Sequence, residues 1–199
     1  QGAPLILGDG ETDGSVLSMR IVDAEVRAQE ALELRARLDH LTGLANREEA
    51  FGRLGQILQR TRRGGDEIAV LFCDFDDFKR VNDRHGHAGG DELLRTVAGR
   101  IRMAVRSADL VARIGGDELL VVLDGVHDLA EAVQIAENLR RLVVLPVDLP
   151  NGMVSTTMSI GVTLSADGES LDDVVARADA AMYRAKNFGR DQVFAIAGN

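Results

Sequence analysis

The sequence contains little cysteine and no apolar run long enough to cross a membrane. Cys73 is the single cysteine, so no internal disulfide can form, which fits a reducing compartment. A helix that spans a bilayer needs about 18 to 20 apolar residues in succession, and no stretch of this chain approaches that length. We therefore expect a cytoplasmic domain.

Basic residues are also in short supply. The chain has 23 Lys and Arg against 32 Asp and Glu, which gives a formal net charge of −9. Non-specific binding of nucleic acid depends on a basic surface, so we expect no nucleic-acid partner. A phosphorylated ligand can still bind where a metal ion or a few placed cations neutralise it. The hydrophobic content of 45% is enough to build a core and too high for a disordered chain.

The chain divides into a short leader, a helix and a main domain. We expect a loop at residues 1–19, a linker or signalling helix at 20–38 and the main domain at 39–199. Ala31, Leu34, Leu38 and Leu41 follow the 3,4,3 spacing of a coiled-coil seam. The alternative is one amphipathic helix packed on its own domain, and both interpretations stay open. The chain begins at Gln1, and residues 13–33 resemble the last strand and exit helix of a PAS sensor, so we expect an upstream sensory domain outside this sequence.

Helical and strand patterns mix along residues 39–199. Residues 67–75 (EIAVLFCDF) are apolar and β-rich, as in a buried strand. Asn46 is placed to cap the helix that follows it. The mixture predicts an α/β class, as an α+β sandwich with a mixed central sheet flanked by helices. The expected helices are 47–63, 91–106, 129–143 and 171–186, and the expected strands are 67–75, 110–114, 119–123, 154–164 and 192–196.

The hexamer GGDELL occurs twice, at residues 89–94 and 115–120. In the second copy Gly115 and Gly116 separate two apolar runs, which predicts a β-hairpin with Asp117 and Glu118 at its tip. A phosphate can approach such a turn closely, because it has no side-chain bulk. The first copy is expected to open a helix, with Asp91 at the cap or in the first turn. A solvated hairpin tip and a helix cap are the plain structural interpretations.

The end of strand 67–75 favours a site over those interpretations. Asp74 ends the strand, and Asp76 and Asp77 follow it. A carboxylate there, opposite Asp117 on a neighbouring hairpin, is an arrangement that holds Mg²⁺, which takes one or two carboxylates together with phosphate oxygens and waters. Two such ions can promote an in-line displacement at phosphorus.

Other ion and phosphate sites fit the sequence less well. Residues 74–85 lack the Gly and the final Glu of a calcium loop, because Lys79 and His85 stand there. The pattern GxxxxGK[ST] of a Walker loop is absent. His85 and His87 have no cysteine partners that would favour zinc.

Six motifs in register identify a family. DHLTGLANR, DFDDFKRVND, GHAGGDELL, RIGGDEL, SIGV and ADAAMYRAKNFGR occur in this order. Together, over residues 38–194, they resemble the GGDEF domain of diguanylate cyclases. The resemblance implies a fold similar to the nucleotidyl cyclase and polymerase palm, with a catalytic β-hairpin. It also implies synthesis of cyclic di-GMP from two GTP, with release of two pyrophosphates, by a homodimer that uses Mg²⁺ or Mn²⁺.

The resemblance assigns roles to residues at the matching positions. Asp74, Asp117 and Glu118 are the implied catalytic residues, and the metal would be held by Asp74, Asp117 and the Phe75 carbonyl. Asn82 and Asp91 match the guanine-reading positions, where a carboxylate can accept from N1–H and N2–H₂. The implied substrate-binding residues are Lys79, Asn82, Asp91, Gly115, Gly116, Lys186 and Arg190, of which Lys79, Lys186 and Arg190 would hold the β- and γ-phosphates.

A second site is implied for the product. Arg106 and Asp109 form RSAD, which resembles the family's RxxD inhibitory site for cyclic di-GMP. Arg140 or Arg141 would add a contact from a neighbouring domain. The alternative for RSAD is a helix-terminal Arg beside a loop Asp.

The signature departs from the family pattern at its fifth letter, where Leu119 replaces Phe. An apolar side chain can still pack there with some loss of fit, so we expect activity. The alternative function is an inactive domain that acts as a receptor for GTP or cyclic di-GMP. A cyclase that makes a mixed dinucleotide is a third candidate, which Asn82 and Asp91 disfavour.

Overall fold

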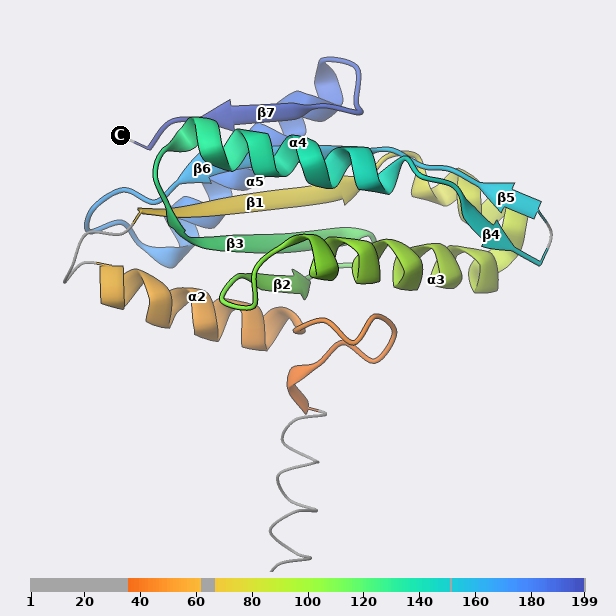
Figure 1. Cartoon of the computed structure of the whole chain (residues 1–199), viewed down its shortest axis with the longest axis horizontal. Helices are drawn as coiled ribbons and strands as arrows, with labels where there is room; N and C mark the ends of the chain where they lie inside the picture. Colours follow the sequence, from red (N-terminus) through yellow and green to blue (C-terminus); the bar gives the residue numbers. More distant parts are fainter. Residues whose placement is uncertain (1–35, 62–66, 151, 199) are drawn as a thin grey trace, which may run out of the picture. The chain divides into compact units, whose positions relative to one another are not determined.

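The computed structural model describes residues 36–61, 67–150 and 152–198. Contacts divide the chain into two units, Gln1–Ala36 and Arg37–Asn199, and the architecture below is that of the second (Figure 1). The predictions for residues 1–19 and for most of 20–38 lie outside the described residues. The elements are α2 (Arg47–Thr61), β1 (Glu67–Phe75), α3 (Phe78–Ala104), β2 (Leu110–Arg113), β3 (Glu118–Val126), α4 (Leu129–Val143), β4 (Val147–Leu149), β5 (Gly152–Val154), β6 (Met158–Leu164), α5 (Leu171–Asn187) and β7 (Val193–Ile196).

A five-stranded mixed sheet forms the centre of this unit. Its strand order is β2-β3-β1-β6-β7, with β1 antiparallel to both β3 and β6, and β6 parallel to β7. Every residue of β1 after Glu67 is buried, because the strand is central and covered on both faces. The short strands β4 and β5 pair separately as a hairpin. The predicted mixed sheet with flanking helices is confirmed.

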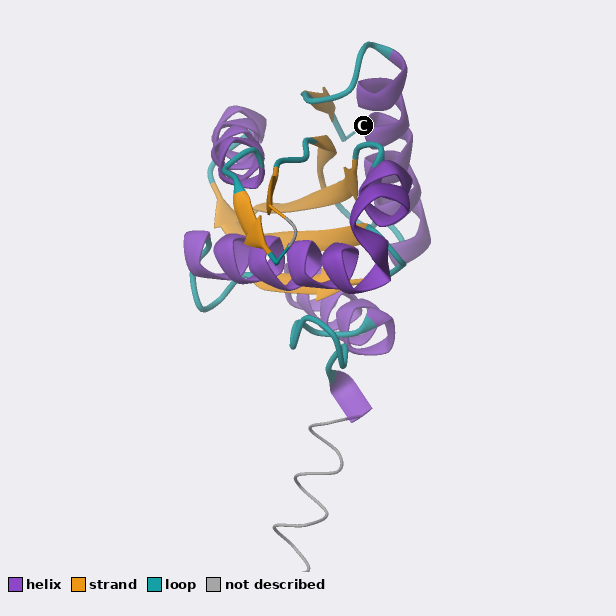
Figure 2. Cartoon of the chain, turned by 90° about the vertical axis from the view of Figure 1, so that its right-hand side faces the viewer, coloured by secondary structure: helices purple, strands orange, loops and turns teal. Residues whose placement is uncertain are grey.

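Helices cover both faces of the sheet (Figure 2). Successive side chains of a strand point to opposite faces. Leu71 and Cys73 of β1 accordingly belong to the core shared with α3 and α4. Val70 and Phe72 belong to the core shared with α2 and α5. Among the described residues, no helix is both long enough and apolar enough to cross a membrane.

Several predicted boundaries are confirmed and others are wrong. The strand at 67–75 and the helix at 129–143 match β1 and α4. Asn46 caps α2, since its Oδ1 accepts from the Glu49 amide at 3.0 Å. The strand expected at 154–164 is shorter, because its first residue belongs to β5 and β6 begins at Met158.

The largest correction concerns α3. It begins at Phe78 rather than near Asp91, and it is interrupted at Gly86, whose φ of 73° and ψ of 169° are non-helical. The first GGDELL therefore lies inside the helix and does not open it. Gly89 and Gly90 are buried there, and a Cβ at Gly90 would overlap the Asn82 side chain. These glycines serve close packing, whereas the sequence pattern had indicated a helix start.

Candidate active site

Asp74, Asp117 and Glu118 lie near one another where β1 pairs with β3. Asp74 on β1 is the register partner of Glu118 on β3. The Phe75 amide donates to the backbone carbonyl of Asp117 at 3.2 Å. The antiparallel pairing of β1 with β3 thus brings together the end of one strand and the start of the other. The predicted catalytic residues Asp74, Asp117 and Glu118 are neighbours in space.

Asp74 is the most perturbed carboxylate of this cluster. It is 6% exposed, and the Lys186 Nζ lies 2.7 Å from its Oδ1. Burial raises the pKa of Asp74 to about 6; Lys186 opposes the rise, and the nearby Asp117 and Glu118 add to it. One ammonium group therefore stands against three acidic side chains, so the site favours an additional cation.

Hydrogen bonds from the Arg113 side chain hold the turn of the β2–β3 hairpin in place. Nε and Nη2 of Arg113 donate to the Gly116 carbonyl at 3.1 and 2.7 Å, and Nη1 donates to Asp39 Oδ1 at 3.2 Å. Asp39 also accepts from the Thr42 amide and hydroxyl, at 2.9 and 2.7 Å. Burial alone would raise the pKa of Asp39, but the bonds from Thr42 and Arg113 hold it below its usual value. A charged network thus ties the glycine turn to the loop before α2.

The second glycine of the turn has free space where a side chain would lie, and the first does not. A Cβ on Gly115 would overlap the carboxylate of Glu118, whereas a Cβ on Gly116 would meet nothing within 4 Å. Glu118 therefore folds back over Gly115, and this is possible only because Gly115 has no side chain.

The donors of this site fit a magnesium ion that takes only part of its ligands from the protein. Asp74 and Asp117 offer carboxylate oxygens, and Mg²⁺ takes one or two carboxylates together with phosphates and waters. Within the part of the chain that the structure describes, no three His, Cys, Asp or Glu side chains group so as to hold a metal. The residues present therefore fit an ion shared with a phosphate ligand better than one enclosed by protein.

The two predicted guanine readers lie on either side of the break in α3. Asn82 lies before Gly86 and Asp91 after it, and the Asn82 side chain packs against Gly90, the residue that precedes Asp91. Phe78 closes the same contact, since its ring would lie 3.1 Å from a Cβ on Gly90. The break at Gly86 is what lets one helical segment face the next.

Comparison with known proteins identifies the family. The family described as "Diguanylate cyclase, GGDEF domain" matches residues 36–192. The chain belongs to the GGDEF-domain family of diguanylate cyclases. Response regulator PleD from Caulobacter vibrioides is 38% identical over 194 residues, which cover 91% of this chain and 42% of PleD. Diguanylate cyclase TpbB from Pseudomonas aeruginosa is 41% identical over 162 residues, which cover 80% of this chain and 37% of TpbB. The chain thus spans less than half the length of these two relatives.

Solved structures of GGDEF domains share the fold. The coiled coil and GGDEF domain of DgcB from Caulobacter crescentus, in complex with c-di-GMP, superposes with a TM-score of 0.83 at 30% identity. That match covers 92% of this chain and 100% of the DgcB chain. The GGDEF domain of TpbB from Pseudomonas aeruginosa matches with a TM-score of 0.75 at 40% identity, over 79% of this chain and 99% of that one.

The altered signature letter of this GGDEF domain lies in the core. Leu119 is 1% exposed and pairs with Cys73 in the β1–β3 register. Its side chain packs in the cluster shared with α3 and α4. Burial also raises the pKa of the Cys73 thiol, so it stays protonated and unreactive. The departure from Phe is therefore a change of packing beneath the hairpin, and the carboxylates are unaltered.

The three predicted phosphate-binding cations come from different elements. Lys79 is exposed in the first turn of α3. Lys186, near the end of α5, is bound to Asp74. Arg190 follows α5 with a φ of 63°, and its Nε lies 4.0 Å from Asp77 Oδ1. Lys186 and Arg190 thus contact two of the acids that end or follow β1.

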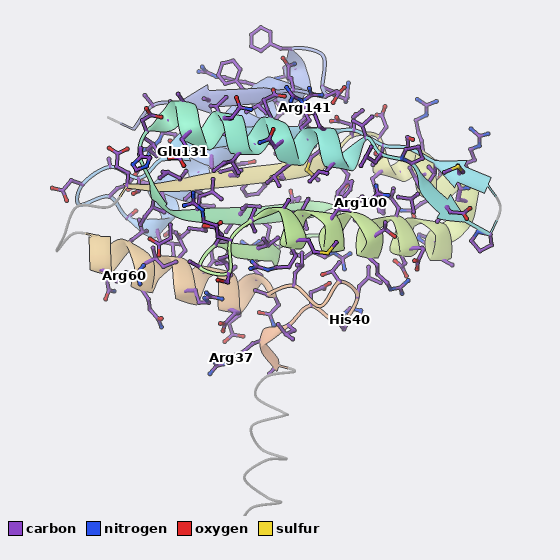
Figure 3. The ribbon with its side chains drawn as sticks, in the orientation of Figure 1. Arg37, His40, Arg60, Arg100, Glu131 and Arg141 are labelled. Carbon is purple, nitrogen blue, oxygen red and sulfur yellow. The ribbon has the colours of Figure 1, made fainter. Side chains whose placement is uncertain are left out.

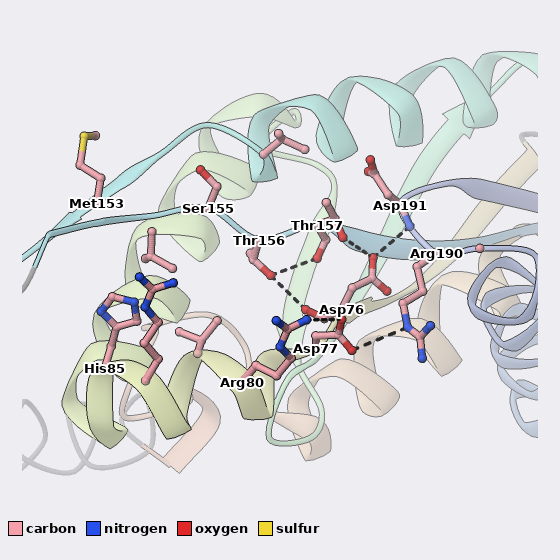
Figure 4. A pocket seen from close by; sticks show the side chains of 15 residues that line it. Asp76, Asp77, Arg80, His85, Met153, Ser155, Thr156, Thr157, Arg190 and Asp191 are labelled. Atoms are coloured by element: carbon pink, nitrogen blue, oxygen red, sulfur yellow. Dashed lines mark hydrogen bonds and ion pairs between the residues drawn. The ribbon is translucent and has the colours of Figure 1, made fainter.

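Asp76 has a structural role that the sequence interpretation missed. It is 6% exposed, and its carboxylate accepts from the Thr157 hydroxyl at 2.6 Å and from the Asp191 amide at 3.0 Å (Figure 4). The Ser159 hydroxyl also donates to it, at 2.7 Å. These bonds fasten the Arg190 loop to the end of β1. The sequence offered an indication of this role. An acidic residue directly after an apolar strand is expected to be buried, and a buried carboxylate needs hydrogen-bond donors.

The residues predicted for product inhibition are placed as follows. Asp109 is 5% exposed and accepts from the amides of Arg106 and Asp124, at 2.8 and 3.2 Å. Asp109 thus also closes a turn, which agrees with the alternative interpretation of RSAD as a helix-terminal Arg beside a loop Asp. The Arg106 guanidinium is exposed, 3.7 Å from Glu131.

The two arginines at the end of α4 differ in their engagement. Arg140 donates to Asp191 at 2.6 Å and to Glu137 at 3.0 Å, and its pKa is raised, chiefly by the bond with Asp191. Arg141 is exposed on α4 (Figure 3). Arg140 is therefore held within the domain, whereas Arg141 faces solvent.

Proposed function

We propose that this GGDEF domain condenses two GTP into cyclic di-GMP and releases two pyrophosphates. The observation that carries the proposal is the cluster of Asp74, Asp117 and Glu118 beside a glycine turn, with Lys186 as its nearest cation. Such a cluster suits phosphoryl chemistry, in which positioning and charge neutralisation supply most of the rate enhancement.

In this proposal Asp74, Asp117 and the Phe75 carbonyl hold Mg²⁺ or Mn²⁺. A bound ion would lower the pKa of the attacking 3′-hydroxyl and offset charge on the leaving pyrophosphate. Gly115 and Gly116 leave room for the phosphates to approach the turn. Lys186 exchanges its contact with Asp74 for a phosphate, and Lys79 and Arg190 bind the same phosphate chain. Asn82 and Asp91 read the guanine edge, which disfavours adenine and hence a mixed dinucleotide.

Each domain supplies half of the reacting pair, so the proposal includes a homodimer in the cytoplasm. Two domains face one another, and the 3′-hydroxyl of one GTP meets the α-phosphorus of the other. The helix at 20–38 would set the dimer through a coiled-coil seam, under the control of an upstream sensory domain. The DgcB structure, which contains a coiled coil together with a GGDEF domain, supports this arrangement.

Product inhibition would act through Arg106, Asp109 and an arginine of α4. The sequence leaves Arg140 and Arg141 as candidates for this contact. The solvent exposure of Arg141 favours it, since Arg140 is bound to Asp191. Arg106→Ala should raise the cyclic di-GMP concentration that halves the rate by about tenfold, because a charge-assisted contact is lost. Initial rates at increasing product measure this, with Arg95→Ala as the control. An unchanged inhibition constant would contradict the RSAD assignment.

The competing function is a receptor for GTP or cyclic di-GMP without turnover, and Leu119 in the signature is the observation that favours it. The test is to strip bound nucleotide, add GTP and Mg²⁺, and assay cyclic di-GMP by liquid chromatography with mass detection. Asp74→Asn and Asp117→Asn should each lower turnover by about a hundredfold or more, since each removes a metal carboxylate. Asp179→Asn, an exposed change on α5, should match the parent. Full activity of either site variant would contradict the assignment of Asp74 and Asp117 as metal ligands.

A further inference from the structure

A pocket lies beside the proposed active site. It is a pocket of about 630 Å³ between the first half of α3, the segment Met153–Thr157 and the loop after α5 (Figure 4). Its volume is within the range of small-molecule sites, roughly 300 to 1,000 Å³. The predicted guanine readers Asn82 and Asp91 are not among its lining residues. The pocket meets the proposed phosphate site at Arg190 and Asp77.

The arginines of the pocket have fewer hydrogen-bond and ion-pair partners than its residues Asp76 and Asp191. Asp76 is fully engaged by Thr157, Ser159 and the Asp191 amide. The Asp191 carboxylate accepts from Arg140, which lies outside the pocket lining.

On the cationic side, Arg80 and Arg84 stand one helical turn apart on α3. Arg80 and Arg190 share Asp77 in long contacts, of 3.8 and 4.0 Å. Arg84 makes no ion pair within 4.0 Å with any of the residues that the structure describes. Three guanidinium groups thus line one hollow. Asp77 is shared by Arg80 and Arg190, which leaves the Arg84 guanidinium available to an anion.

Part of the pocket lining is apolar. Val81, which is buried, and Val144 and Met153, which are exposed, line the pocket beside the hydroxyl-bearing residues Ser155, Thr156 and Thr157. His85, which also lines the hollow, has its Nδ1 buried without a hydrogen-bond partner among the described residues. A lining that contains both guanidinium groups and apolar side chains is complementary to a molecule that has a phosphate and an apolar body.

We propose that this pocket binds a phosphate ester with an apolar body, at a site separate from the GTP site. Arg80 and Arg84 hold the phosphate, and Val81, Val144 and Met153 contact the body. Binding itself does not depend on the proposed cyclase activity. A regulatory consequence does rest on that function: because Arg190 borders both sites, an occupant of the pocket changes the affinity for GTP.

The test is titration of phenyl phosphate into the ¹⁵N-labelled full chain, without GTP or metal, followed by amide chemical shifts. Phenyl phosphate should bind more tightly than inorganic phosphate and shift amides near Val81 and Val144. Arg84→Gln should weaken binding about fivefold to tenfold, because one charge-assisted contact is lost. The dissociation constant should be unchanged in two controls. These are Arg53→Gln, the same change at an exposed position of α2, and Lys186→Gln, in the proposed GTP site.

Three results would overturn the proposal. The first is an absence of saturable binding by the parent chain. The second is equal weakening by Arg84→Gln and Arg53→Gln, which would indicate a general charge effect. The third is loss of binding in Lys186→Gln with retention in Arg84→Gln, which would put the probe in the GTP phosphate site. Since no turnover is measured, failure here is distinct from failure of the cyclase assignment.

Discussion

At the scale of single residues, Asp74 combines burial with a functional charge. Burial raises the pKa of its carboxyl to about 6, above the ordinary value of 3.8. The folded chain therefore binds a proton more tightly than the unfolded chain does. The stability that this group contributes is fully present below pH 3.8 and is lost as the pH rises through 6.

Asp74→Asn should accordingly stabilise the metal-free protein at high pH. At pH 8 we expect its free energy of unfolding to exceed that of the parent by about 3 kcal/mol, and near pH 4 the difference should be small. Urea unfolding at the two pH values, with chelator present, measures this, and Asp179→Asn serves as the control. A variant that is less stable than the parent at pH 8 would show that the contact with Lys186 outweighs the effect of burial.

Gly115 and Gly116 offer a matched pair of substitutions. Gly115→Ala forces the Glu118 carboxylate to move, whereas Gly116→Ala meets nothing within 4 Å. Because only the end of a flexible side chain is displaced, we expect Gly115→Ala to keep the parent melting temperature but to lower kcat by about tenfold. Gly116→Ala leaves Glu118 in place, but its Cβ enters the space proposed for the phosphates, so it should keep the parent kcat and raise the KM for GTP. Equal rates for both variants would mean that the position of Glu118 does not matter.

At the scale of elements, the close packing of α5 on β6 positions Lys186. A Cβ on Gly161 of β6 would overlap the Ala178 carbonyl and the Met182 amide of α5, and backbone atoms cannot turn aside. Gly161→Ala should therefore lower the free energy of unfolding by about 3 kcal/mol or more, as severe overpacking does. Gly99→Ala, in an open position of α3, should raise it by about 0.5 to 1 kcal/mol. Thermal unfolding of both variants decides, and a Gly161→Ala protein as stable as the parent would refute this packing.

The elements that the sequence predicted well are those with a strong pattern. The uninterrupted apolar run of β1 and the amphipathic α4 allow few alternatives. The start of α3 was missed because Gly86, Gly89 and Gly90 normally indicate a turn, and here two of the three are buried inside a helix. The strands β4 and β5 have three residues each, too short for alternation to be visible.

At the scale of the whole molecule, the sequence predicted which residues gather but not how they are engaged. Asp74 and Asp117 were expected to be neighbours because a strand end and a hairpin can meet on one sheet. The contact of Lys186 with Asp74 depends on the placement of α5, which no local pattern encodes. The bond from Arg113 to Asp39 joins residues 74 positions apart, and such pairs follow from the fold alone.

The central claim is that two copies of this domain, each holding one GTP, make cyclic di-GMP. The most direct measurement is product formation from GTP and Mg²⁺ by the chain fused to a parallel coiled coil, which holds it as a dimer, beside the same fusion with Asp117→Asn. The account predicts cyclic di-GMP from the parent fusion and a rate lower by about a hundredfold from the variant. No product from a nucleotide-free parent fusion that still binds GTP would contradict the cyclase assignment and favour a receptor.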